Sequence, residues 1–381
     1  MTEWKEYKLG EIVTFQRGHD LPKDKMIDGD IPVAGSNGII GYHNQFTKEG
    51  PGVTIGRSGN IGIPHYYPNA YWAHNTVLYI FDFKGNDAKF MYYLLKTFDF
   101  TQLNTGSAVP SLNRNHIHEL PVSIPDVSTQ RRIAAILSSL DDKIDLLHRE
   151  NASLEQMAET LFRQWFVEES KEEWEEGKLG DYVDETIGGE WGKENPEGDF
   201  IKSVQCIRGT DIADLSVGLA TKTPIRYVKE SKFEKIEPRN GDIIMEISGG
   251  TENQSTGRVA YVNDDVKTLF DYPIIFSNFC RLLRVKEEHT YFIYCYLKYL
   301  YEQDEFFNLE NGSSGIKNLD YKALLYELTY PMPNDKQQIL DFNDKVNVYF
   351  EKINRNKQQI QTLIQTRDGL LPRLMSGEIK V

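Results

Sequence analysis

The stretch Trp4-Lys5-Glu6-Tyr7-Lys8-Leu9-Gly10 returns later in the chain as Trp174-Glu175-Glu176-Gly177-Lys178-Leu179-Gly180. Three further segments return in the same order: Phe90-Met91-Tyr92-Tyr93-Leu94-Leu95-Lys96 as Phe292-Ile293-Tyr294-Cys295-Tyr296-Leu297-Lys298, Gly106-Ser107 as Gly312-Ser313, and Glu119-Leu120 as Glu327-Leu328. A repeat of this length holds a whole domain and a helix, not one unit of a solenoid. The sequence therefore predicts two similar domains in a pseudo-twofold object, which suits a target with two separated half-sites.

Each copy ends in a long segment with heptad spacing. The first has Ile133, Leu137, Leu140, Ile144, Leu147, Asn151, Leu154, Ala158, Leu161 and Trp165 at alternating steps of four and three. The second has Ile339, Phe342, Val346, Tyr349, Ile353, Asn356, Ile360, Leu363, Arg367, Leu370 and Leu374. Heptads sustained this long are typical of coiled coils. We expect Asp126, Ser128, Asn334 or Asp335 to cap the helices, and Ser376-Gly377 to end the second.

The register of the two helices can be predicted as well. An antiparallel arrangement places Asn151 opposite Asn356, the only asparagine in each seam, because a buried amide without a partner costs about 1–3 kcal/mol. It then pairs Ile133 with Leu374, Leu137 with Leu370, Ile144 with Leu363, Leu147 with Ile360, Leu154 with Ile353, Leu161 with Val346, and Trp165 with Phe342. Leu140 meets Arg367, whose guanidinium we expect to reach solvent or a partner subunit. The alternative is that both asparagines lie on the rim.

The sequence of the repeated domains predicts a mixture of helices and strands. Residues 53–56, 76–81, 242–247 and 281–285 are predicted strands, and residues 88–98 and 290–300 are predicted helices. The predicted fold class is α+β, with two pseudo-repeated domains separated by two long antiparallel coiled-coil helices. The domain boundaries are expected at residues 1–125, 126–169, 170–332 and 333–381.

Composition limits the class of protein. The 381 residues carry a formal net charge of −14, and 40% are hydrophobic, which is typical of a globular chain with room for two domains. The acidity argues against a globally basic nucleic-acid binder, although local surfaces decide binding. Three cysteines without a CxxC pair favour neither a disulfide framework nor a zinc site. We expect a cytoplasmic protein with no membrane partner.

No catalytic motif is present in the sequence. Walker A, GxGxxG, HExxH and GxSxG patterns are absent. The glycines of residues 35–41 and 56–62 lack the flanking strand and helix of a nucleotide-binding loop, so we interpret them as turn glycines. An amino-group methyltransferase would need Asn-Pro-Pro and an aromatic residue, whereas Asn195-Pro196 is followed by Glu197. We expect no catalytic residue, no metal site and no cofactor in this chain.

Polar loops supported by glycine remain, at corresponding places in the two repeats. Arginine reads guanine edges, asparagine reads adenine, and hydroxyl groups hold phosphates, so these loops are candidates for contacts with DNA. The candidate residues are Arg17, Arg57, Ser58, Asn60, Asn113, Arg114, Arg208, Thr210, Ser248, Asn253, Arg258 and Lys317. Arg57 and Arg258 are the first choices. Each loop taken alone is also compatible with an ordinary surface turn.

The whole pattern resembles the specificity (S) subunit of type I restriction-modification systems. The residues that carry the resemblance are Trp4–Val13 with its copy Trp174–Val183, Gly50–Gly62, Ile124-Pro125 followed by Gln130-Arg131-Arg132-Ile133-Ala134-Ala135-Ile136-Leu137, and Thr366–Gly377. The resemblance implies two target-recognition domains that each read half of a split DNA sequence. It also implies two helices that hold two methyltransferase (M) subunits. The M subunits would use S-adenosylmethionine, and restriction (R) subunits would use ATP and Mg²⁺.

Two other classes of protein remain open at this level. One is a coiled-coil adaptor that binds only protein partners, and the other is a small enzyme whose site forms only in three dimensions. Heptad-rich helices are compatible with the adaptor, but an adaptor does not need duplicated loop-bearing domains. Which bases are read depends on loop geometry, which the sequence does not specify.

Overall fold

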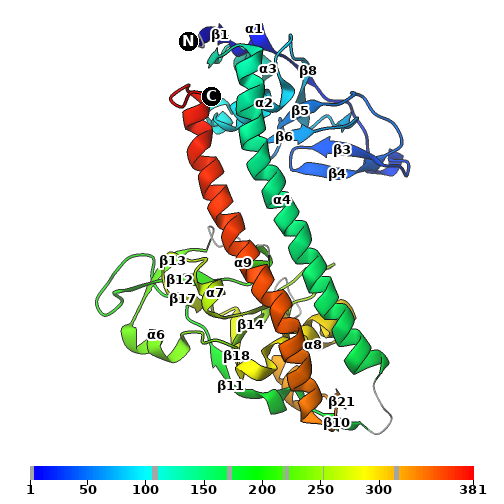
Figure 1. The fold of residues 1–381 in the computed structure, drawn as a ribbon, viewed down its shortest axis with the longest axis vertical. Helices are drawn as coiled ribbons and strands as arrows, with labels where there is room; N and C mark the ends of the chain where they lie inside the picture. Colours follow the sequence, from blue (N-terminus) through cyan, green and yellow to red (C-terminus); the bar gives the residue numbers. More distant parts are fainter. Residues whose placement is uncertain are drawn as a thin grey trace. The chain divides into compact units, whose positions relative to one another are not determined.

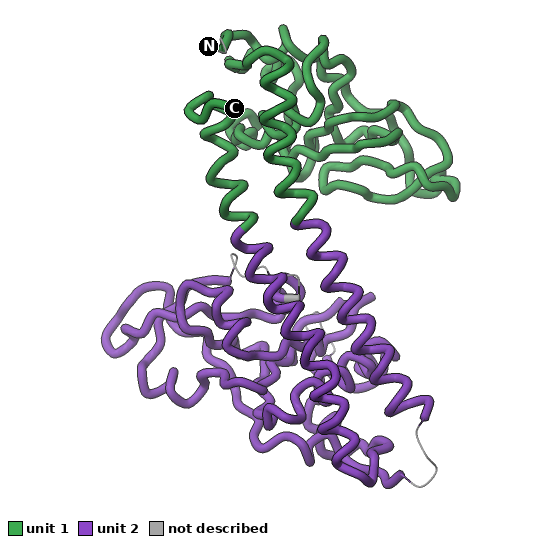
Figure 2. Tube along the Cα trace, viewed as in Figure 1, with its two compact units in different colours: residues 1–143, 363–381 green, residues 144–362 purple. Residues whose placement is uncertain are grey.

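The computed structural model describes residues 4–104, 110–169, 174–216, 218, 223–251, 253–312 and 317–381. The chain forms two compact units, residues 1–143 with 363–381 and residues 144–362 (Figure 2). Each unit combines helices with small sheets, so the predicted α+β class is confirmed. Within the described residues, no helix is both apolar enough and long enough to cross a membrane.

The first domain, residues 4–124, contains two main sheets (Figure 1). A four-stranded sheet has the order β2 (Thr14–Arg17), β8 (Val77–Asp82), β5 (Gly52–Gly56) and β6 (Pro64–Tyr67). A three-stranded sheet has the order β4 (Gly38–His43), β3 (Ile31–Gly35) and β7 (Trp72–Ala73). The remaining elements are β1 (Lys5–Lys8) paired with β9 (Pro121–Ile124), and the helices α1 (Leu9–Ile12), α2 (Ala88–Lys96) and α3 (Arg114–His118).

The second domain, residues 174–332, repeats this plan. Its four-stranded sheet has the order β11 (Val183–Gly188), β18 (Cys280–Val285), β14 (Ile243–Glu246) and β16 (Val259–Tyr261). Its three-stranded sheet has the order β13 (Ile225–Val228), β12 (Lys202–Ile207) and β17 (Ile274–Phe276). Further elements are β10 (Glu175–Gly177) with β21 (Tyr330–Met332), the sheet β15 (Ser248–Gly249), β20 (Lys317–Leu319), β19 (Glu310–Asn311), and the helices α5 (Asp211–Ser216), α6 (Glu230–Ile236), α7 (Asp264–Lys267) and α8 (Thr290–Glu302).

Backbone hydrogen bonds match the two domains residue by residue. The amide of Arg57 donates to Thr76 O, and the amide of Ile247 donates in the same way to Phe279 O. The carbonyl of Arg57 then accepts from Leu112 N at 2.9 Å, as the carbonyl of Ile247 accepts from Leu319 N at 3.0 Å. Arg57 and Ile247 therefore occupy matched positions.

A pair of glycines confirms the match on the other side of this loop. Gly62 and Gly257 both have positive φ, and a Cβ on either would strike a buried aromatic ring, Phe100 or Phe306. The loop between the matched strands is residues 57–61 in the first domain and the longer segment 247–256 in the second. The predicted turn role of the glycines in residues 56–62 agrees with this geometry, since Gly59 also has positive φ.

The two heptad segments form α4 (Val127–Arg163) and α9 (Lys336–Met375) (Figure 1). Asp126 caps α4 by accepting from Thr129 N, and Asp335 accepts from Gln337 N at the start of α9. Helix α9 ends just before Ser376-Gly377, where Gly377 has a φ of 75°. The predicted starts and stop are confirmed. Asp126 has a lowered pKa because Thr129 N donates to its carboxylate.

The predicted asparagine pair is present in the second unit. Asn356 Nδ2 donates to Asn151 Oδ1 at 2.8 Å, and both residues are buried. Nearer the start of α9, the rings of Trp165 and Phe342 lie 6.1 Å apart, as the same register requires. The rim alternative for the asparagines is therefore wrong, because they are 6% and 1% exposed.

The expectation for Arg367 is wrong. Within the first unit, its Nη1 donates to Asp141 Oδ1 at 2.7 Å, and Asp141 also accepts from the Tyr93 hydroxyl at 2.6 Å. Asp141 directly follows Leu140, the residue predicted to face Arg367, so a carboxylate was available one position away. The guanidinium is used inside the unit and is only 20% exposed.

Candidate nucleic-acid interface

The candidate loops gather at one end of each four-stranded sheet, which we call the loop end. In the first domain it is the end where β2 and β5 finish and β8 begins. In the second domain it is the end where β11 and β14 finish and β18 begins. Strand order alone therefore brings together loops that are distant in sequence.

Arg17 and Arg57 lie together at the loop end of the first domain. Arg17 is the exposed last residue of β2, and Arg57 directly follows β5. Burial lowers the pKa of the Arg57 guanidinium, and the nearby charge of Arg17 lowers it further. Neither side chain forms an ion pair with the part of the chain that the structure describes. Two close guanidinium groups without a counterion attract an anion such as a phosphate, or the acceptor edge of guanine.

The backbone around Arg57 is held firmly. Arg57 N donates to Thr76 O at 2.8 Å, Ser58 N donates to the same carbonyl at 3.2 Å, and Leu112 N donates to Arg57 O. These bonds join the loop after β5 to the segments before β8 and before α3. The Arg57 side chain therefore starts from a fixed backbone, which lowers the entropic cost of making a contact.

The other candidates of the first domain have mixed roles. The side chain of Asn60 donates to Asn37 Oδ1 at 2.5 Å and so links the two neighbouring turns. Asn113 caps α3 by accepting from Asn115 N. Arg114 is exposed at the first position of α3 and its charge lowers the pKa of His118, after the larger effect of burial. Asn60 and Asn113 thus support loops, while Arg114 projects from one.

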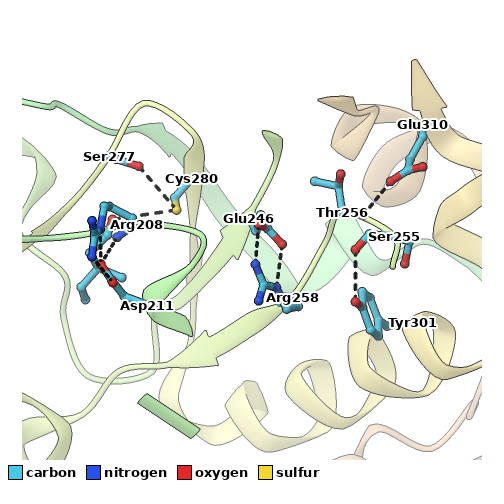
Figure 3. A network of polar contacts seen from close by, with 11 residues as sticks. Arg208, Asp211, Glu246, Ser255, Thr256, Arg258, Ser277, Cys280, Tyr301 and Glu310 are labelled. Atoms are coloured by element: carbon cyan, nitrogen blue, oxygen red, sulfur yellow. Dashed lines mark hydrogen bonds and ion pairs between the residues drawn. The ribbon is translucent and has the colours of Figure 1, made fainter. Parts of the chain in front are cut away.

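In the second domain the predicted cations are paired with carboxylates inside the domain (Figure 3). Arg258 Nε and Nη2 donate to the two oxygens of Glu246 at 2.9 and 2.8 Å, and this hydrogen bonding raises the pKa of Arg258. Arg208 is bonded in the same bidentate way to Asp211, and Lys317 Nζ lies 2.7 Å from Glu310. The carboxylates of Glu246, Asp211 and Glu310 are 3–5% exposed.

Three uncharged candidates complete this loop end. Ser248 lies in β15 and pairs with Asn318 of β20. Thr210 is exposed in the turn before α5, and Asn253 is exposed in the long loop 247–256. Thr210 and Asn253 are exposed and Ser248 is half-buried, so all three are accessible in part or in full.

The sequence interpretation missed Arg281, the second residue of β18. Its guanidinium lies 4.7 Å from the ring centre of Tyr321. In the sequence it is the first residue of the predicted strand 281–285, and nothing there distinguishes it from other strand residues. No sequence signal identified it, because its place opposite the end of β11, where the first domain has Leu78 opposite the end of β2, is known only from the strand register.

An acidic cleft lies at the other end of the sheet of the second domain. This cleft of about 570 Å³ is lined by residues next to β14, β16 and β18 and by four residues of α9. Its carboxylates are Asp264, Asp265, Glu287, Glu288, Asp344 and Glu351. These six carboxylates contribute to the net charge of −14 without lying at the loop end, so the net charge of the chain does not describe the charge near the loops.

Comparisons with known proteins relate the sequence and the fold of this chain to one family. A model of the type I restriction modification DNA specificity domain matches residues 1–156 and 171–362. The type I restriction enzyme MjaIX specificity subunit of Methanocaldococcus jannaschii is 28% identical over 325 residues, which are 78% of this chain and 70% of that protein. The type I restriction enzyme HindI specificity subunit of Haemophilus influenzae is 25% identical over 195 residues, 44% and 42% of the two chains. The crystal structure of a type I restriction-modification S subunit from M. genitalium has the same fold, with a TM-score of 0.60 at 16% identity over 98% of this chain and 96% of that one.

Proposed function

The chain belongs to the type I restriction-modification DNA specificity family, and on that premise we propose that its two domains each read one half of a bipartite target in double-stranded DNA. Residues 1–125 and 170–332 would act as the two target-recognition domains. The observation that carries this proposal is the duplication itself. Two sheets of the same topology each present a loop end with arginine, asparagine and hydroxyl side chains.

The residues at each loop end suit contacts with a duplex. Arg17, Arg57 and Arg114 are available in the first domain, with Ser58 as a phosphate donor. In the second domain we assign Thr210, Ser248 and Asn253 to direct contacts. Arg208, Arg258 and Lys317 shape the loops there through their carboxylate partners, a supporting role that the ion pairs favour. Arginine and lysine that are already paired offer less free charge to phosphate.

The two helices would connect the domains and hold two M subunits. We assign residues 126–169 and 333–381 to this role, because each contains exposed heptad-flanking positions beyond those used in the seam. The chemistry would come from the partners: methyl transfer with S-adenosylmethionine in the M subunits, and ATP- and Mg²⁺-dependent restriction in R subunits. This chain would contribute recognition and no catalytic group.

Sequence mapping of methylated sites tests the proposal. The chain and its M subunit, expressed in a host without other methyltransferases, should methylate a motif of two specific half-sites with an unspecific gap. Replacing residues 1–125 with those of a relative should change one half-site and leave the other. A continuous motif, or a swap that alters both halves, would contradict independent reading. Failure of the S–M complex to shift duplex DNA at low salt would favour the protein-only adaptor.

Equal insertions into both helices test their role as a spacer. One heptad added between Lys143 and Ile144, and one between Thr362 and Leu363, falls at the boundary between the compact units in both helices. Seven helical residues add about 10 Å, which is about three base pairs. We expect the gap to lengthen by that amount with both half-sites unchanged. An unchanged gap would show that the helices do not set the distance.

A further inference from the structure

The match between the two domains shows that the arginine at the loop end lies on different strands of the two sheets. Arg17, the last residue of β2, pairs with Leu78, whereas Gly188, the last residue of β11, pairs with Arg281. The next residues, Gly18 and Gly189, fix this alignment, because a Cβ on either would strike the two carbonyls just before β8 or β18. The first domain thus has arginine opposite leucine, and the second has arginine opposite glycine.

The guanidinium of Arg281 occupies the space that a side chain on Gly188 would need. A Cβ on Gly188 would lie 2.9 Å from Arg281 Nη1. Residues directly opposite each other in an antiparallel pair project from the same face of the sheet. The positive group therefore lies near the position from which the Arg17 side chain starts in the first domain, although it comes from the neighbouring strand.

Arg281 differs from the other cations of this loop end. Its Nε is buried with no hydrogen-bond partner, and its guanidinium forms no ion pair within the described ranges. The ring of Tyr321 orients it. Tyr321 lies two residues after Leu319, just as Arg114 lies two residues after the matched Leu112. By contrast, Arg258 and Lys317 are satisfied by buried carboxylates.

A purely structural role for Arg281 is disfavoured by the first domain. Leu78 fills the matched position there and is 2% exposed, so an apolar side chain satisfies the packing of this strand. An arginine that keeps a buried donor without a partner is costly to the fold. Because Nε itself is buried, a ligand can offset this cost only through acceptors for the Nη1 and Nη2 groups of the same guanidinium.

We propose that Arg281, oriented by Tyr321, reads a guanine in the half-site of the second domain, as Arg17 or Arg57 would in the first. The inference rests on the proposed function of the two domains. A guanidinium that stacks on an aromatic ring keeps its planar donors free for the N7 and O6 acceptors of guanine in the major groove. Arg281 would then be the principal specificity residue of the second domain, in place of Arg258.

The test uses the complete chain in complex with its M subunit. Arg281→Leu introduces the residue that the first domain has at this place, so we expect unfolding at the wild-type temperature. Methylation of a randomised DNA library should lose its guanine preference at one position of the second half-site. Binding to the original target should fall about 10- to 100-fold. Arg281→Lys should lose the same preference, because an ammonium group cannot form the bidentate contact.

A strand-exchange variant and a control sharpen the result. In Gly188→Arg with Arg281→Leu, the arginine returns to the strand that carries it in the first domain, and we expect a guanine preference at that position to reappear. Arg239→Leu removes the same charge at the opposite end of the sheet and should leave the motif unchanged.

Three outcomes separate the hypotheses. An unchanged second half-site in Arg281→Leu, with a bipartite wild-type motif, overturns the role of Arg281 but keeps the proposed function. A uniform loss of affinity with every position still specified also overturns it, since it identifies a phosphate contact. A wild-type complex without a bipartite motif overturns the proposed function and this inference with it.

Discussion

The two domains share one sheet topology but treat their charged loops in opposite ways. The first domain leaves Arg17 and Arg57 without a carboxylate partner among the described residues. The second domain pairs Arg258 with Glu246, a residue that replaces Gly56 of the first domain at the matched end of the strand. The pair lies at the base of the longer loop 247–256, where the first domain has Gly56 and Ile63, which cannot form an ion pair. A common fold therefore leaves the electrostatic roles of matched loops free to diverge.

Removal of the Arg258–Glu246 ion pair should have the largest effect on the stability of the chain. Arg258→Ala leaves the 3% exposed carboxylate of Glu246 without its partner. The loss of one partner of a buried pair costs about 3–5 kcal/mol of the free energy of unfolding. Urea denaturation of the chain should show this loss in the second unit, while the first half-site stays in the methylation motif.

The double variant and a surface pair serve as controls for that prediction. Glu246→Ala with Arg258→Ala should recover most of the lost stability, because no isolated charge remains. Arg355→Ala on α9, where the pair with Glu351 is 72% and 48% exposed, should change stability by less than about 1 kcal/mol. Wild-type stability in Arg258→Ala, together with one relaxed base position, would restore Arg258 as a direct contact.

The second unit also contains a buried lysine, which gives it a pH dependence. Burial lowers the pKa of Lys357 to about 8; Glu155 opposes this shift and Lys298 adds to it. The unfolded chain therefore binds more protons between pH 8 and the ordinary lysine value, and stability rises with pH across that window. Lys357→Met should stabilise the chain by about 1–3 kcal/mol at pH 7.

The gain should shrink as the pH approaches 10, which urea denaturation at pH 7 and pH 9.5 can measure. Lys352→Met, on the same helix with its side chain 47% exposed, is the matched control and should show no such trend. A gain in Lys357→Met that is equal at both pH values would assign the effect to apolar packing instead of ionisation.

Arg57 should affect recognition and leave stability intact. Its side chain has no partner in the described part of the first domain, so Arg57→Ala should change the free energy of unfolding by less than about 0.5 kcal/mol. We expect a loss of about 1–3 kcal/mol in binding and one relaxed position in the first half-site. Wild-type affinity with an unchanged motif would remove Arg57 from the interface and weaken the contrast between the domains.

What the sequence predicted depends on whether a repeating pattern along the chain carries the information. The caps Asp126 and Asp335 and the Asn151–Asn356 layer were predicted because heptads and caps are local patterns that fix a helix and its register. The parallel pairing of β3 with β7 was not, since no pattern along either short strand shows which strand it will join. The roles of Arg258 and Arg281 also required the fold: only the structure shows which arginine meets a buried carboxylate and which meets a tyrosine ring.

The last prediction concerns the asparagine layer of the second unit, where the double variant should show a net change of only about 1 kcal/mol. Asn356→Leu should cost about 1–3 kcal/mol, because it leaves Asn151 buried with both ends of its amide unpaired. Replacing both asparagines with leucine should recover this loss and add about 1 kcal/mol, since polar seam residues fix register at a cost in stability.

Cysteines in place of Leu147 and Ile360, the predicted facing pair, should crosslink in the parent chain. Cysteines in place of Leu147 and Ile353, one heptad away, should crosslink only in the double leucine variant. A double variant that gains no stability and keeps a single crosslinking register would show that the packed domains, and not the asparagines, select the alignment of the helices.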